Sequence, residues 1–84
     1  MKLIIEFKNG QKEAFDDVFA YGWRDDYCVD IEIETEIIKS NYYGKAYYYI
    51  KSDDVASITE ITGNIVNVLK KQGDEFVNIA GRGI

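Results

Sequence analysis

The sequence predicts a small β-rich single domain over residues 1–84, an antiparallel sheet curved toward a barrel, with at most one short helix after residue 52. Three observations favour this class. Eighty-four residues can bury one modest core. The chain has no proline and is divided by glycines into short segments, and its clearest segment alternates strictly between apolar and polar residues. The alternative is an α+β domain in which a helix over residues 53–71 packs on the sheet.

The N-terminal segment predicts a hairpin. Residues 2–8 alternate imperfectly between apolar and charged side chains, as a half-buried strand does. Asn9 and Gly10 follow, and they are a strong hairpin signal because both tolerate the positive φ of a type I′ turn. Residues 11–18 then form the return strand, although their apolar residues also fit a short helix.

The segment from Tyr27 to Ile38 is the clearest predicted strand. Over residues 29–37 the odd positions are β-branched residues and the even positions are acids, so one face belongs to the core and the other carries a row of carboxylates. The core positions are Val29, Ile31, Ile33, Thr35 and Ile37, and the carboxylates are Asp30, Glu32, Glu34 and Glu36. Residues 40–44 are then expected to form a turn, and residues 45–51 a partner strand that sets lysines and tyrosines beside the acids.

Residues 52–72 admit two interpretations. A helical stripe of apolar residues, Ser52 as a cap and Gly73 as a terminator favour one helix. Several β-branched residues and the interruption at Gly63 disfavour it. We therefore expect a short helical turn near residues 53–57, followed by two extended pieces. Residues 75–80 are expected to form a last strand, and residues 81–84 a frayed tail.

Charge is unevenly distributed along the chain. Residues 1–42 carry ten acids and five bases, so the whole net charge of −5 lies in the first half. The basic footprint that phosphate backbones require is missing, so direct nucleic-acid binding is not expected. No apolar run approaches the roughly 20 residues of a membrane span, and Glu6 interrupts the apolar start that a signal peptide needs. We expect a cytoplasmic protein.

The sequence predicts no enzyme, no cofactor and no metal site. The single cysteine, Cys28, has no histidine to activate it, because the chain contains none, and the usual Cys and His zinc sets cannot form. Alternate carboxylates on a strand lie about 6.8 Å apart, near the separation in inverting glycosidases. A solvated strand face, however, provides neither a cleft nor the environment that would raise the pKa of one carboxyl. The acids at 25, 26, 30 and 32 also lack the spacing of a calcium loop.

Aromatic residues are the second unusual feature. Five of the seven tyrosines lie within residues 42–49, too many for so small a core. Tyrosine is a good strand former, so it occurs on the outer faces of sheets. It is also typical of protein interfaces. Trp23 precedes two acids after one intervening residue, so it either plugs the core or anchors a partner within an acidic rim. The candidate protein-binding residues are Trp23, Asp25, Asp26, Asp30, Glu32, Glu34, Glu36, Tyr42, Tyr43, Tyr47 and Tyr49.

The favoured functional hypothesis is a non-enzymatic inhibitor or regulator that binds a basic protein, such as a nucleic-acid-binding enzyme, through its acidic strand face. Carboxylates about 6.8 Å apart approach the spacing of backbone phosphates, as in the small DNA mimics by which phages and mobile elements disarm host nucleases. The alternative is a self-assembling structural or accessory module, a homo-oligomer that uses its tyrosine-rich face or its strand edges. Single-strand nucleic-acid binding through the tyrosines is the weakest hypothesis, because the chain is acidic.

Overall fold

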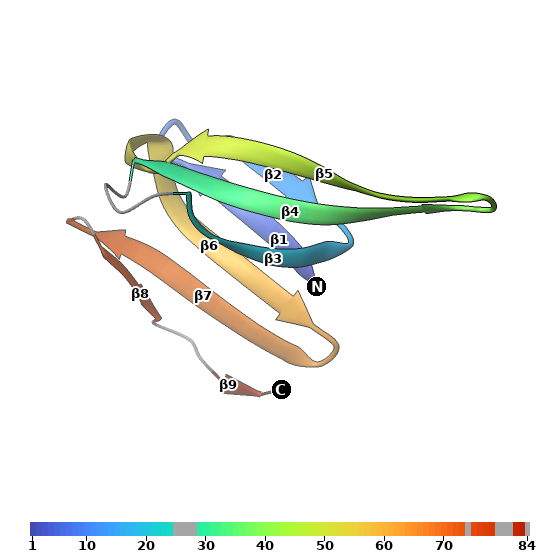
Figure 1. Cartoon of the computed structure of the whole chain (residues 1–84). Coiled ribbons are helices and arrows are strands. Elements are labelled where there is room, and N and C mark those ends of the chain that lie inside the picture. The colour runs from blue at the N-terminus through green and yellow to red at the C-terminus, as the bar shows by residue number, and fades with distance from the viewer. Residues whose placement is uncertain (25–28, 74, 79–81, 84) are drawn as a thin grey trace.

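Two antiparallel sheets make up the computed structural model, which describes residues 1–24, 29–73, 75–78 and 82–83 (Figure 1). The first sheet has the strand order β2-β1-β6-β7-β8, and β9 pairs with the start of β7, along the same edge as β8. The second has the order β3-β4-β5. The β-rich class is thus confirmed, but the sheets stay open and do not close into a barrel.

The bounds of the strands follow the chain. In the first sheet they are β1 (Lys2–Phe7), β2 (Lys12–Phe15), β6 (Val55–Thr62), β7 (Ile65–Gln72), β8 (Glu75–Asn78) and β9 (Arg82–Gly83). In the second sheet they are β3 (Val18–Trp23), β4 (Asp30–Lys39) and β5 (Tyr42–Lys51), after which a single 3-10 turn, η1 (Ser52–Asp54), leads back to β6.

All three strands of the second sheet, β3, β4 and β5, lie between β2 and β6 in the sequence. The chain leaves the first sheet through Asp16 and Asp17, with Asp17 in the left-handed region at φ 55°, which aspartate tolerates better than most residues. It returns through η1. Within the first sheet β1 therefore pairs with β6, and Phe7 lies opposite Val55.

One core lies between the two sheets. Leu3, Ile5 and Ile33 are fully buried, as is Val55, and the rest of the buried cluster comes from both sheets. Its other members are Phe15, Val18, Ile31 and Ile58.

The alternation of β4 was predicted correctly over the part that the first sheet covers. Ile31, Ile33 and Thr35 are buried. Val29, expected in the core, is half exposed because it lies just before the start of β4, at the edge of the two-sheet core. Ile37 is only partly buried, because the strand is leaving the core there.

The β4–β5 hairpin extends past the rest of the molecule (Figure 1). The longest dimension is 44 Å and the radius of gyration 13.4 Å, whereas a compact domain of this length has a radius of gyration of about 12 Å. The residues near the hairpin end, Ile38, Tyr42 and Tyr43, are exposed by 73%, 58% and 60%. The protruding part is thus a two-stranded ribbon with solvent on both faces.

Two predicted turns differ from the structure. The first hairpin loop has Gly10 at φ 88° but no positive φ at Asn9, and the Gly10 amide donates to the Phe7 carbonyl at 2.9 Å. This is a three-residue loop that ends in a left-handed glycine, not a type I′ turn. The predicted turn over residues 40–44 is also too long, because Tyr42 already pairs with Lys39 and begins β5.

A return strand and the two extended pieces are present, so both helical alternatives, over residues 11–18 and over residues 53–71, are wrong. The return strand ends at Phe15 rather than at residue 18, because Val18 already begins β3 of the second sheet. The helical turn occurs at Ser52–Asp54 rather than at residues 53–57. Gly63, at φ 57°, turns the chain between β6 and β7. Residues 81–84 were expected to fray; Arg82 and Gly83 instead pair with β7, while residues 81 and 84 lie outside the described part.

Candidate protein-binding face

The predicted carboxylates share one exposed face of the second sheet with residues of β5. Directly opposed residues of antiparallel strands point to the same side. Glu32 lies opposite Tyr49, Glu34 opposite Tyr47, and Glu36 opposite Lys45. We call this surface the outer face; its β4 and β5 residues are Asp30, Glu32, Glu34, Glu36, Ile38, Tyr43, Lys45, Tyr47, Tyr49 and Lys51.

Two of the four carboxylates already hold a cation. The Lys45 ammonium lies 3.5 Å from the Glu34 carboxylate, and the Arg24 guanidinium lies 3.7 Å from that of Asp30. The charge of Glu34 is the main reason that the pKa of Lys45 is raised. A hydrogen bond with Glu34 is the first cause of the raised pKa of Tyr47.

Aromatic rings complete both cation sites. Arg24 lies over the Tyr49 ring, 4.6 Å from its centroid, and Lys45 lies over the Phe19 ring at 4.8 Å. Each cation therefore has a carboxylate and a ring as neighbours, an arrangement that attracts ammonium and guanidinium groups. Phe19 and Arg24 were not predicted from the sequence, because β3 was not identified there as a strand.

The other two carboxylates, those of Glu32 and Glu36, have no ion pair within the described residues. The Tyr43 hydroxyl lies at 3.5 Å from the Glu36 carboxylate, a weak contact between exposed groups. Glu32 has no hydrogen bond or ion pair within the described residues, and it lines a shallow depression of about 210 Å³ together with Ala20 and Gly22 of β3. Ala20 and Gly22 have little or no side chain, so this depression stays open beside Glu32, which is itself partly buried.

The remaining predicted residues do not all join this face. Tyr42 lies at the hairpin end and leans over Gly44, where a Cβ would collide with its ring. Asp25 and Asp26 lie outside the described residues. Trp23 pairs with Ile31 and points to the other side of the sheet.

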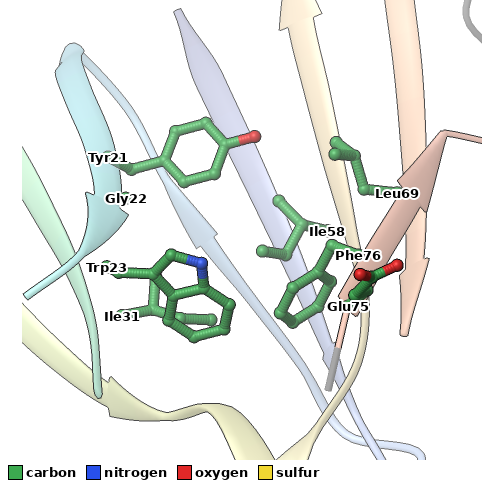
Figure 2. A pocket seen from close by; sticks show the side chains of 8 residues that line it. All are labelled: Tyr21, Gly22, Trp23, Ile31, Ile58, Leu69, Glu75 and Phe76. Atoms are coloured by element: carbon green, nitrogen blue, oxygen red, sulfur yellow. The ribbon is translucent and has the colours of Figure 1, made fainter. Parts of the chain in front are cut away.

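Trp23 borders a groove between the two sheets rather than plugging the core. It is 40% exposed, and its ring centroid lies 5.7 Å from that of Phe76 on β8. Figure 2 shows Tyr21, Trp23 and Ile31 on one wall, and Ile58, Leu69 and Phe76 on the other. The groove encloses about 560 Å³.

One polar contact lies beside this groove. The Tyr21 hydroxyl donates to the Glu60 carboxylate on β6 and so joins the two sheets. Burial, and then the Glu60 carboxylate, raise the pKa of Tyr21 well above its ordinary value. A tyrosine held in its protonated form by a carboxylate stabilises the packing of the two sheets and is not activated as a base.

Neither a metal-binding cluster nor a membrane-spanning helix is found in the part of the chain that the structure describes. No three of its His, Cys, Asp and Glu side chains gather closely enough to hold a metal ion. Likewise, none of its helices has the length and apolar character to cross a bilayer.

No family model, curated protein or solved structure matches the chain. A function for it therefore rests on the outer face and the groove themselves.

Proposed function

We propose that the chain is a non-enzymatic inhibitor or regulator that binds a basic protein, such as a nucleic-acid-binding enzyme, through its outer face. The observation that carries this proposal is that the face already seats two of the chain's own cations between carboxylates and aromatic rings. A partner's arginine or lysine would find the same combination of groups beside Glu32 and Glu36.

Glu32 is the favoured contact for a partner's arginine. Its carboxylate borders the depression beside Ala20 and Gly22, and Tyr49 lies opposite it on β5, with Arg24 over one face of the Tyr49 ring. A guanidinium could bind the carboxylate in a bidentate manner and lie against an aromatic face, which an ammonium does less well. The outer face should therefore prefer arginine to lysine.

The net charge of the outer face limits how closely this face can mimic a nucleic-acid backbone. Arg24, Lys45 and Lys51 share it with the four carboxylates, so it is far less negative than a row of phosphates. We therefore propose recognition of individual cationic side chains between tyrosines, and not a long-range electrostatic decoy. Binding should weaken with salt because exposed charges are screened.

The test is a titration with an oligoarginine peptide, followed by NMR of the backbone amides. Addition of peptide should shift the amide signals around Glu32 and Tyr49, and oligolysine should bind more weakly. The double variant Glu32→Gln and Glu36→Gln should lower the affinity at least about tenfold.

A matched control removes the same charge elsewhere. Glu13→Gln with Asp54→Asn changes two exposed acids of the first sheet and of η1, so it should leave the affinity nearly unchanged. Equal losses in both double variants would mean that only net charge matters, and the outer face would then have no specific role. The same two variants should be compared in capture of partners from host lysate at low and high salt.

A further inference from the structure

The outer edge of β5 has a set of unused main-chain hydrogen-bonding groups. The Ser52 amide donates to the Val29 carbonyl at 2.9 Å, which fixes the alternation along the two strands. Even-numbered residues of β5 therefore bond to β4, and odd-numbered residues turn their N–H and C=O groups to the open edge. The Arg24 amide bonded to the Asp30 carbonyl at 3.0 Å agrees, because it places the even residues of β4 toward β3.

This edge is long and regular, and no strand of the described part of the chain pairs with it. β5 is the last strand of its sheet over ten residues, with a continuous register to β4 and no bulge. The five edge-directed residues are all exposed. Proteins usually shorten, twist or cover such a strand, because it can pair with another chain. The five residues are Tyr43, Lys45, Tyr47, Tyr49 and Lys51.

We propose that β5 pairs antiparallel with β5 of a second copy, with Tyr47 opposite Tyr47 on a two-fold axis, so that the two second sheets form one continuous sheet. In this register all five edge-directed residues find a partner, which provides about ten main-chain hydrogen bonds. That number is typical of a specific protein interface. The proposal does not depend on the binding of a basic partner.

Side chains disfavour two of the alternative registers. With Tyr47 on the axis, Lys45 lies opposite Tyr49 of the second copy, and Lys51 opposite Tyr43. A register centred on Lys45 sets lysine against lysine, and one centred on Tyr48 sets Lys45 against Lys51, which costs stability.

The inner face of the paired strands is complementary as well. Gly44 lies opposite Ile50 of the second copy and Ala46 opposite its Tyr48, so each small residue meets a large one. Tyr48 is 44% exposed in the single chain although its ring packs 5.1 Å from that of Phe15. Pairing therefore covers Tyr48, which is partly exposed to solvent in the single chain.

Cysteine cross-linking tests both the pairing and its register. In a Cys28→Ser background, Tyr47→Cys places two thiols on the axis, with Cα atoms about 5.5 Å apart, within the range of a disulfide. Tyr49→Cys is the matched control, because its two copies would lie four residues out of register, about 13 Å apart along the strand direction. Mild oxidation should convert most of the first variant to a covalent dimer and little of the second.

A second measurement uses the chain without added cysteine. Light scattering over a range of concentrations should give a dimer for the wild type. Tyr47→Pro removes an amide hydrogen that β4 does not use, and it should weaken the dimer about 10- to 100-fold. Ala14→Pro is the control, because its amide also faces the open edge of β2: the Phe7 amide bonds to the Gln11 carbonyl and so sets the alternation there.

Each outcome decides the matter. A wild-type chain that stays monomeric at millimolar concentration, or equal cross-linking at positions 47 and 49, would overturn the proposal. If Tyr47→Pro fails to fold, as circular dichroism would show, the comparison of the two cysteine variants still decides it. A dimer that both proline variants leave intact would place the interface elsewhere.

Discussion

Replacing Ile33 by alanine tests the packing of the two sheets. Ile33 is fully buried in the middle of β4. The substitution removes three carbon groups at about 0.8 kcal/mol each. It also leaves a cavity of about 80 Å³ if nothing relaxes, at about 24 cal/mol per Å³. Partial collapse brings the expected loss in the free energy of unfolding to about 3–4 kcal/mol, a large share of the roughly 4–13 kcal/mol expected for 84 residues.

Equilibrium unfolding in urea, followed by the fluorescence of Trp23, measures this loss. Trp23 is the only tryptophan and contacts Phe76 of the other sheet, so its emission should change when the sheets separate. Ile38→Ala is the matched control on the same strand; Ile38 is 73% exposed, and its loss should stay below about 0.5 kcal/mol. Ile33→Val, at about 1 kcal/mol, serves if the alanine variant does not fold. Similar losses at positions 33 and 38 would refute the two-sheet core.

Three further outcomes are expected. Gly10→Ala should cost more than about 1 kcal/mol, because Gly10 has φ 88°, whereas Gly22→Ala has free space and should be nearly neutral; thermal unfolding compares the two. The raised pKa of Tyr21 keeps its phenol protonated in the folded chain at pH values where the unfolded chain has released that proton. Stability should therefore fall as pH rises above about 10, and less steeply in Tyr21→Phe, as urea midpoints between pH 9 and 11 would show; parallel curves would contradict this. Lys71 has a side chain only 9% exposed and donates to the Ser52 carbonyl at 2.9 Å and to Asp53 at 3.1 Å. Lys71→Met should lower the free energy of unfolding by about 1–3 kcal/mol. Asp53→Asn, at a 91% exposed side chain, should lower it by less than about 0.5 kcal/mol. Urea unfolding measures both losses, and a larger loss for Asp53→Asn would contradict the role of Lys71 in holding η1.

The alternation of apolar and acidic residues in β4 predicted which side chains share a face. It did not predict how much of the apolar face other strands cover. A period of two assigns Ile33 and Ile37 to the same face, yet only Ile33 is fully buried. Whether a face is covered depends on which distant strands reach it, and the pattern within one strand carries no such information. The sequence therefore predicted one curved sheet where the chain forms two.

Local irregularity explains the strand that was missed. The register of β3 shifts between Val18 and Ala20, so its side chains do not alternate regularly. The candidate face was consequently predicted in part. The pairing of acids with lysine and tyrosine on β5 followed from the sequence, but the contribution of Phe19 and Arg24 from β3 did not.

The placement of β1 beside β6 has a consequence for folding kinetics. Phe7 and Val55 are opposed in the sheet although almost fifty residues separate them, and closing such a loop costs about 3 kcal/mol in chain entropy. The hairpins β4–β5 and β6–β7 close over two residues each, so they can form early. The union of β1 with β6 should come late and set the rate, and folding in milliseconds to seconds is expected for a topology of this kind.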